Sequence, residues 1–374
     1  MSEHVLVTGG AGFVGSHLVD ALIAAGHRVR VLDSLDPQVH GPGDKAPAYL
    51  APAAELVRGS VTDAETVART LEGIDIVFHQ AAAVGVGQSM YDIVHYCHAN
   101  TVGAAVLLEE IVKRRDRIRK IVVASSMSVY GEGACRTSNG EMRSPRLRSR
   151  DRLERSEWEM RDPDTGEPLS PMPTPETKPL HPTSVYAVTK RDHEELFLTV
   201  GYAYRIPTVA LRYFNIYGER QALSNPYTGV AAIFSSRILN GQAPMIFEDG
   251  EQSRDFVHVT DVVQANLLAL ETDRADYEAL NVGTGQPTTI RQVADATLDA
   301  LRRPDLTPCI LGKFREGDIR HCYADISRAH ALLGYAPKVT FGDGMRRLVA
   351  WVKGQRAVDR FDQAHLQLVE RGLA

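Results

Sequence analysis

The stretch VLVTGGAGFVGSHLVDAL, residues 5–22, decides the fold. An apolar run leads into Gly9, Gly12 and Gly15, and apolar residues at helical spacing follow. This order predicts a strand, a tight glycine turn and a helix. The glycines allow the turn and let backbone N–H groups at the helix N-terminus approach a pyrophosphate, where the helix dipole favours anions.

A second strand candidate, HRVRVLD (27–33), ends in Asp33. A carboxylate at the tip of that strand accepts hydrogen bonds from the hydroxyls of an adenosine ribose. It would also repel a 2′-phosphate, and no arginine follows it in SLDPQVHG (34–41). The pattern therefore predicts a dinucleotide site that favours NAD over NADP.

A third segment, RKIVVASSMSVYGEG (119–133), places serines behind a β-branched run that is typical of a buried parallel strand. Ser125, Ser126 and Ser128 emerge at the carboxyl end of this strand, where open α/β sheets bind ligands. A serine at that place can hold a substrate hydroxyl, whereas serines after a strand taken alone are usually turn formers.

Tyr186 and Lys190 lie four apart in SVYAVTK (184–190), which reads as the start of a helix. Positions i and i+4 share one helix face, so the phenol and the ammonium project together. A free tyrosine has a pKa of about 10, and moving it near neutrality takes about 4 kcal/mol. One cation about 4 Å away supplies roughly that energy at an effective dielectric near 20. We expect Lys190 to lower the pKa of Tyr186 and make it a general base for a sugar or alcohol hydroxyl.

These motifs together resemble the extended short-chain dehydrogenase/reductases, and specifically their nucleotide-sugar epimerase/dehydratase branch. The resemblance covers nearly the whole chain and includes VFHQAA (77–82), Asn100, LRYFNIYG (211–218), QSRDFVHVTDV (252–262), NVGTG (281–285) and REGDIRHCYAD (315–325). It implies an NAD-dependent enzyme that acts on a nucleotide-diphosphate sugar.

The resemblance also implies three groups of site residues. The catalytic group is Ser126, Tyr186 and Lys190. The NAD group is Gly9, Gly12, Phe13, Val14, Gly15, Asp33, Ser60, Val61, Gln80, Ala81, Ala82, Asn100, Tyr186 and Lys190. The substrate group is Ser126, Ser128, Asn215, Arg254 and Arg315, of which the two arginines would grip phosphates. Ser60 stands where the family commonly places an aspartate against the adenine, and Asp63 lies close by.

Alternating strands and helices continue to about residue 130, which favours an α/β fold with a doubly wound parallel (Rossmann) sheet and a smaller, mostly C-terminal α+β substrate lobe. We expect a dinucleotide-binding domain over 1–218 and a substrate lobe mainly over 219–374, from which 257–283 returns to the first domain. Helix candidates at 289–302 and 325–333 are assigned to the smaller lobe.

Two segments have no place in these motifs. Residues 132–180 form a long charged insertion rich in Pro, Ser and Gly, and such loops are usually functional or disordered. It is either a solvated insertion, or a flap over the sugar site or an oligomer contact, with Trp158 and Met160 as anchors. The final stretch, 355–374, reads as an exposed amphipathic helix with no assigned role.

Composition limits the partners. With 374 residues and 44% hydrophobic content, the chain can bury a large core in two lobes. A net charge of −5 gives no basic footprint for nucleic acid. Four scattered cysteines without CxxC pairing indicate reduced thiols in a cytoplasm, and neither a metal site nor a disulfide is expected. We expect no signal peptide, because the first apolar segment is the nucleotide-binding strand itself, and no membrane partner, because no run reaches about 18 apolar residues.

The outcome of the reaction depends on the residues after Ser126. The family's 4,6-dehydratases place Asp-Glu there, its decarboxylases rely on a Glu where Ser128 stands, and its 3,5-epimerases place a Cys there. This chain has Met127 and Ser128, so 4-epimerisation remains. The resemblance favours dTDP-L-rhamnose as substrate, giving dTDP-6-deoxy-L-talose, and a homodimer built from the helices near 100–113 and 185–200. A UDP-glucose 4-epimerase, an NDP-4-ketosugar reductase and a catalytically silent NAD-binding sensor stay open.

Overall fold

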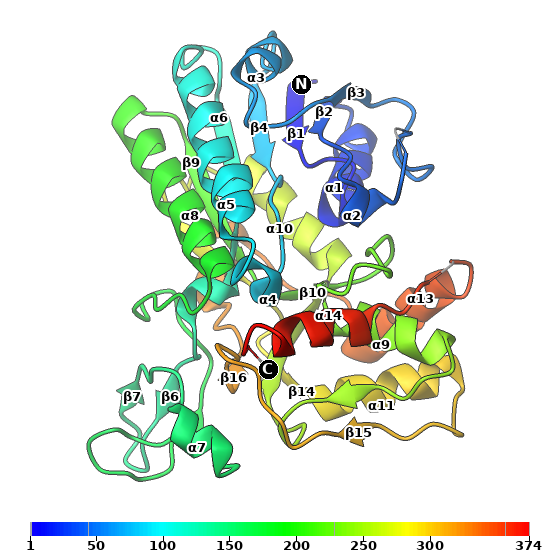
Figure 1. Cartoon of the computed structure of the whole chain (residues 1–374). Helices are drawn as coiled ribbons and strands as arrows, with labels where there is room; N and C mark the ends of the chain where they lie inside the picture. Colours follow the sequence, from blue (N-terminus) through cyan, green and yellow to red (C-terminus); the bar gives the residue numbers. More distant parts are fainter. Residues whose placement is uncertain (1, 44, 228, 356, 374) are drawn as a thin grey trace.

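The structure is a computed structural model that describes residues 2–43, 45–227, 229–355 and 357–373. At the centre of these residues lies a sheet of seven parallel strands in the order β13-β9-β5-β4-β1-β2-β3 (Figure 1). Its strands are β1 (His4–Thr8), β2 (Arg28–Asp33), β3 (Glu55–Arg58), β4 (Ile76–His79), β5 (Lys120–Ser126), β9 (Thr208–Tyr213) and β13 (Ala279–Val282). The order reverses between β1 and β4, at the switch point where such sheets bind ligands. The predicted doubly wound α/β fold is confirmed.

Helices cover both faces of this sheet. The side chains of β1 alternate, so that Val5 and Val7 join one core and Leu6 joins the other. The face of Val5 is covered by α1 (Phe13–Ala24), α10 (Val259–Glu271) and α12 (Ser327–Leu333). The face of Leu6 is covered by α3 (Ala64–Thr70), α6 (Gly103–Val112) and α8 (Val185–Tyr204).

Helix α12 corrects the expected division of the chain. Its pattern was assigned to the smaller lobe, but Ala329 and Leu333 pack into the core of the central sheet with Val5 and Val7. An apolar helical stripe shows that a helix is covered on one face, and it does not show which sheet covers it. Helix α10 also packs into the core of the central sheet, and β13, which follows it, is the edge strand of that sheet.

The smaller lobe has a core of its own, in which Phe234, Val293 and Leu348 are buried together. Its strands are β10 (Asn215–Tyr217), β12 (Ser253–His258), β14 (Pro287–Thr289) and β16 (His321–Cys322) in one sheet, and β11 (Met245–Ile246) and β15 (Cys309–Ile310) in another. Its helices are α9 (Val230–Leu239), α11 (Ile290–Leu301), α13 (Phe341–Val352) and α14 (Phe361–Val369). Among the helices of the described residues, none combines the length and apolarity needed to cross a membrane.

The insertion folds into a small ordered unit. It contains α7 (Arg150–Glu154) and an antiparallel sheet of β6 (Cys135–Arg136), β7 (Met142–Arg143) and β8 (Ser170–Pro171), which Figure 1 shows beside the smaller lobe. Trp158 and Met160 are buried, and Met160 packs on Cys135 and Leu169 inside the insertion. Two ion pairs, Arg148–Glu248 (2.8 Å) and Arg320–Glu159, tie this unit to the smaller lobe.

Candidate active site

Tyr186 lies in the first turn of α8, close to the carboxyl end of β5. Ser184 caps this helix by accepting the N–H of Ala187 (3.1 Å), and Ser89 Oγ accepts the N–H of Tyr186 (3.0 Å). Ser126, the last residue of β5, hydrogen-bonds to the Tyr186 phenol. The structure therefore brings the predicted serine and tyrosine together, and both residues are buried.

Lys190 lies one turn further along α8 and is buried. Its Nζ donates to the carbonyl of Ala124 in β5 (2.7 Å) and lies 3.4 Å from His193 Nδ1. Burial lowers the pKa of Lys190 to about 7, while burial raises the pKa of Tyr186 to about 12 against the opposing hydrogen bond from Ser126. The expectation that Lys190 lowers the pKa of Tyr186 is wrong for the protein alone, because desolvation dominates both groups and the amine is directed at a carbonyl of β5.

Two buried histidines near Lys190 were missed by the sequence reasoning. The ring of His193 lies 5.1 Å from that of His79 at the end of β4, and Thr8 Oγ1 lies 2.8 Å from His79 Nδ1. Burial and the nearby Lys190 charge lower the pKa of both imidazoles, that of His79 to about 3, so both rings are neutral. A neutral His193 can accept a hydrogen bond from the Lys190 ammonium. The signal available in the sequence is its i+3 spacing from Lys190.

A buried ion pair between Arg212 and Glu194, which the sequence reasoning also missed, lies next to the catalytic residues. Arg212 of β9 donates from Nε to Glu194 Oε2 (2.8 Å), and Ser125 Oγ donates to the same oxygen (2.8 Å). Arg212 further donates to the hydroxyl of Tyr130 (2.7 Å). Because Glu194 lies on α8 and Ser125 precedes Ser126, this network fixes the helix of Tyr186 against the strand of Ser126.

The glycine turn has the geometry that a dinucleotide needs. Gly9 has a φ of +67°, and a Cβ at Gly15 would lie 2.1 Å from Gly9 O, so neither position accepts a larger residue. Helix α1 begins at Phe13 with no acidic residue in its first turn and no side-chain cap from Gly12. Its N-terminus, with Phe13 and Val14 in the first turn, thus fits the negative charge of a pyrophosphate.

Asp33 lies at the carboxyl end of β2, beside the glycine turn. Its buried carboxylate accepts the N–H groups of Ala11 (3.0 Å) and Leu35 (2.9 Å), which hold it in place. A fixed carboxylate at this edge fits the ribose hydroxyls of NAD and disfavours the 2′-phosphate of NADP.

The segment after β3, which we expected to contact the adenine, has its polar side chains hydrogen-bonded within the segment. Ser60 Oγ lies 2.8 Å from Thr62 Oγ1, and the neighbouring Val61 is buried against the core of α3 and α6. Asp63, the nearby acid, caps α3 and accepts the hydroxyl of Thr66 (2.6 Å). Asp63 therefore serves the helix and does not replace the missing adenine contact.

The other predicted cofactor residues lie along the end of β4. Gln80, Ala81 and Ala82 follow that strand directly, and Gln80 Nε2 donates to the hydroxyl of Tyr213 (3.1 Å). Asn100 is fully buried in the π-helix η1 (Cys97–Val102), accepts the N–H of Ala83 (2.7 Å) and donates to Thr189 (2.9 Å). Its amide therefore holds α8 against the β4 loop.

The predicted substrate residues comprise polar residues close to the catalytic serine or on β10, and two arginines of the smaller lobe. Ser128 donates to Ser126 Oγ (2.9 Å), and Asn215 in β10 has a buried Oδ1 without a partner in the described residues. Arg254 donates to the carbonyls of Ser253, Ile319 and Arg320 at 2.6–3.0 Å, and burial lowers its pKa from the usual value. Arg315 pairs with Asp318 (2.8 Å) and stacks on Phe247 (4.6 Å), so its charge is already engaged within the protein.

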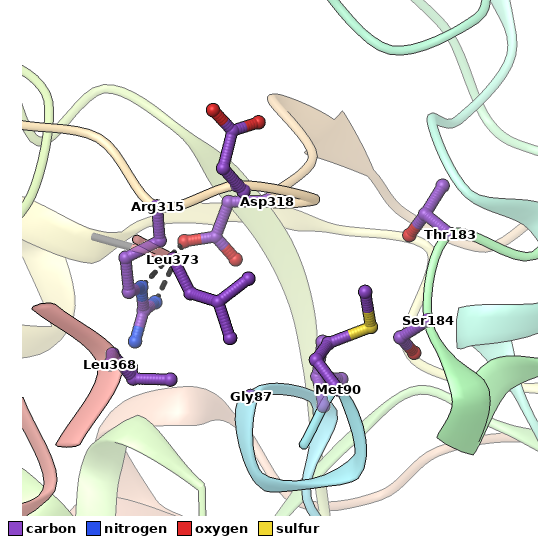
Figure 2. Close-up of a pocket in the computed structure, with 10 residues that line it drawn as sticks. Gly87, Met90, Thr183, Ser184, Arg315, Asp318, Leu368 and Leu373 are labelled. Atoms are coloured by element: carbon purple, nitrogen blue, oxygen red, sulfur yellow. Dashed lines mark hydrogen bonds and ion pairs between the residues drawn. The ribbon is translucent and has the colours of Figure 1, made fainter. Parts of the chain in front are cut away.

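A small pocket beside Ser184 is lined by residues of both lobes. Thr183, Arg315 and Asp318 contribute polar side chains to its lining, while Met90, Leu368 and Leu373 contribute apolar side chains (Figure 2). The complete lining is Val86, Gly87, Met90, Thr183, Ser184, Arg315, Glu316, Asp318, Leu368 and Leu373. The C-terminal stretch, expected to be an exposed helix with no role, thus lines this pocket.

Comparison with known sequences agrees with this geometry. The model of the NAD dependent epimerase/dehydratase family matches residues 5–150 and 163–283. The chain is 35% identical over 352 residues to a dTDP-L-rhamnose 4-epimerase of Burkholderia thailandensis, covering 94% of this chain and 95% of that protein. It is 31% identical over 358 residues to a UDP-glucose 4-epimerase of Mycolicibacterium smegmatis, covering 94% and 98%.

Solved structures show the same similarity. A UDP-glucose 4-epimerase of Thermotoga maritima with UDP-glucose is 32% identical, with a TM-score of 0.76, and the match covers 94% of this chain and 98% of that one. A UDP-glucose 4-epimerase of Thermus thermophilus with NAD is 31% identical, with a TM-score of 0.73, and the match covers 94% and 100%.

Proposed function

Because the chain belongs to the NAD dependent epimerase/dehydratase family, we propose that it is a nucleotide-sugar 4-epimerase that works through bound NAD. The observation that carries this proposal is the meeting of Ser126, Tyr186 and Lys190 at the end of the central sheet, followed by Met127 and Ser128. The three residues suit the removal of hydrogen from a carbinol. Neither Met127 nor Ser128 offers an ionisable group for dehydration or 3,5-epimerisation.

The residues of the site have separate parts in this reaction. NAD, when bound, supplies reversible storage of the C4 hydride. Tyr186 takes the proton of the C4 hydroxyl, and Ser126, hydrogen-bonded to the phenol, aligns that hydroxyl. Tyr186 is the phenolate base when the proton that it shares with Lys190 lies on the amine. The 4-keto sugar then turns its other face to the cofactor, and Tyr186 returns the proton after the hydride is returned. Net turnover consumes no NAD.

We favour dTDP-L-rhamnose as the substrate and dTDP-6-deoxy-L-talose as the product. The support is the 35% identity to the Burkholderia thailandensis enzyme over nearly the full length of both chains. UDP-glucose is the second candidate, since two of the similar solved structures are UDP-glucose 4-epimerases. Arg254, bound by three carbonyls and directly paired with no carboxylate in the described residues, supports either diphosphate.

We also propose a homodimer through η1, α6 and α8. Helix α8 packs against η1 and α6, and Thr101 of η1 donates to Asp192 of α8 (2.8 Å). Val102 and Val188 are 42% and 45% exposed on η1 and α8. A second copy that packs on these helices would remove this apolar surface from water.

Incubating the enzyme separately with dTDP-L-rhamnose and UDP-galactose, with products resolved by NMR, tests the proposal. We expect a 4-epimer to form without added cofactor, and NAD to be released when the protein is denatured. A stoichiometric loss of added NADH with a 4-keto sugar would instead identify a ketoreductase. Retention of NAD with no turnover of any nucleotide sugar would favour the sensor.

A further inference from the structure

The C-terminal segment 357–373 crosses from the smaller lobe to the dinucleotide-binding lobe. At its start, Arg237 of α9 pairs with Asp359 (3.0 Å) and lies over the ring of Phe361 (4.8 Å). Phe361 and His365 pack against Phe247, with ring centroids 6.4 and 5.6 Å away. Figure 1 shows the resulting helix α14 lying between α4 (Val86–Ser89) and the smaller lobe.

The end of this segment is attached to the other lobe by polar contacts. The hydroxyl of Tyr91, which follows α4, donates to Gln367 Oε1 (3.1 Å) and lies 2.5 Å from the hydroxyl of Tyr227, which donates to the same oxygen (2.7 Å). The guanidinium of Arg371 lies 4.3 Å from the centre of the Tyr91 ring. Contacts on both lobes mean that the segment spans the cleft and does not merely lie on one side of it.

The same segment contacts the loop that carries Arg315. Glu316 N–H donates to Leu373 O (3.1 Å), and the Leu373 side chain lies between the Arg315–Asp318 pair and Met90 (Figure 2). Leu368 packs on Gly87, where an added Cβ would lie 3.5 Å from Leu368 Cδ2. The two leucines therefore form an apolar part of the pocket lining, next to the Arg315–Asp318 pair.

We propose that residues 361–373 are part of the substrate site, and that Leu368 and Leu373 form an apolar wall that selects a sugar without a hydroxyl on C6. The proposal rests on the proposed function, because Tyr186 fixes the position of C4. C6 is bonded to C5, next to C4, so its substituent must lie against a wall near Tyr186. Helix α4, which carries Val86 and Gly87 of the pocket, contacts the backbone of Tyr186 through Ser89 (3.0 Å).

A 6-methyl group fits against Leu368 and Leu373, whereas a hydroxyl on C6 that faces these two side chains would lose a hydrogen bond to water and gain no partner from them. An unpaired buried hydroxyl lowers affinity by roughly 5- to 150-fold. The wall therefore distinguishes the two substrate candidates, of which dTDP-L-rhamnose has the methyl group and UDP-glucose the hydroxymethyl.

The test uses dTDP-D-fucose and dTDP-D-galactose, which differ only in the hydroxyl on C6, and measures dissociation constants by calorimetry on the NAD-loaded protein. We expect wild type to bind dTDP-D-fucose about tenfold more tightly. Leu368→Ala and Leu373→Ala should each lose most of that preference. Leu366 lies on the same helix and is 60% exposed, so Leu366→Ala should keep the preference for dTDP-D-fucose.

The inference would be overturned if wild type bound both sugars equally or bound neither of them. It would also be overturned if both leucine variants kept the wild-type preference. Melting temperature and NAD content identify any variant that fails to fold, and the second leucine variant then decides. Because binding is measured without turnover, an inactive wild type would reject the epimerase proposal and leave the selectivity measurement standing.

Discussion

Replacing His193 tests whether a neutral imidazole controls the charge at the site. With Tyr186 at a pKa of about 12 and Lys190 at about 7, the pair shares one proton between those values. That proton lies either on the phenol or on the amine, and only the second arrangement leaves Tyr186 as a phenolate base. His193 Nδ1, 3.4 Å from Lys190 Nζ, favours the second because it accepts from the ammonium.

The size of the effect follows from that contact. A hydrogen bond to a charged group contributes roughly 1.5–3 kcal/mol, and the long distance places this one at the low end. Since about 1.4 kcal/mol is a factor of ten, His193→Leu should lower the turnover number at neutral pH about tenfold. The acidic limb of the pH profile should move down by about one pH unit, because a less stabilised ammonium loses its proton at lower pH. His193→Gln keeps an acceptor oxygen and should restore both.

The assay is the pH dependence of the turnover number for 4-epimerisation, with NAD content and melting temperature measured on each variant. His79, the other titratable group packed against His193, has a pKa of about 3 and stays neutral across this range. Equal losses in the Leu and Gln variants, or an acidic limb that moves upward in His193→Leu, would refute the reasoning.

Three further predictions concern the base, the cofactor cradle and the insertion. Tyr186→Phe should lower turnover by roughly 10²–10⁴-fold while bound NAD is retained, measured by product NMR and cofactor release; undiminished turnover would remove the assigned base. Gly15→Ala should abolish NAD retention because its Cβ would meet Gly9 O at 2.1 Å, whereas Gly342→Ala, with its nearest atom at 3.7 Å, should retain it. Arg148→Ala should lower the free energy of unfolding by roughly 1.5–3 kcal/mol, since it removes two hydrogen bonds to buried Glu248 and leaves Arg320 as the remaining arginine paired with that carboxylate. Arg150→Ala, in an exposed pair, should lower it by about 1 kcal/mol or less, both measured in urea titrations. Equal effects of the two arginine substitutions would contradict the buried assignment.

The sequence predicted the parts of the site that local geometry determines. The glycine turn and Asp33 were predicted because tight approach and strand ends leave a local signature. The pairing of Ser126 with Tyr186 was predicted because the end of a buried strand and the start of a helix can both be recognised in the sequence. The i+4 spacing of Tyr186 and Lys190 was readable too, but the direction of the amine toward Ala124 depends on where β5 lies against α8.

The missed features depend on contacts between distant parts of the chain. The segment after residue 355 was assigned no role because its amphipathic pattern shows an apolar face without naming Tyr91, Tyr227 and Phe247 as what covers it. Arg315 was expected to face phosphates, and its pairing with Asp318 arises from a turn that no motif specifies. Glu194 and Arg212 lie on elements that meet only in the folded sheet.

Arg254 has a consequence for how long each molecule survives in a cell. Its guanidinium donates to backbone oxygens and is directly paired with no carboxylate in the described residues, so a bound diphosphate would be its first direct ion-pair partner there. A diphosphate at 100 times its dissociation constant would add about 2.7 kcal/mol to the resistance of the native state against unfolding. When nucleotide sugars are scarce, the enzyme would unfold more often and be degraded sooner. Its abundance would then follow the supply of its substrate without a separate regulator.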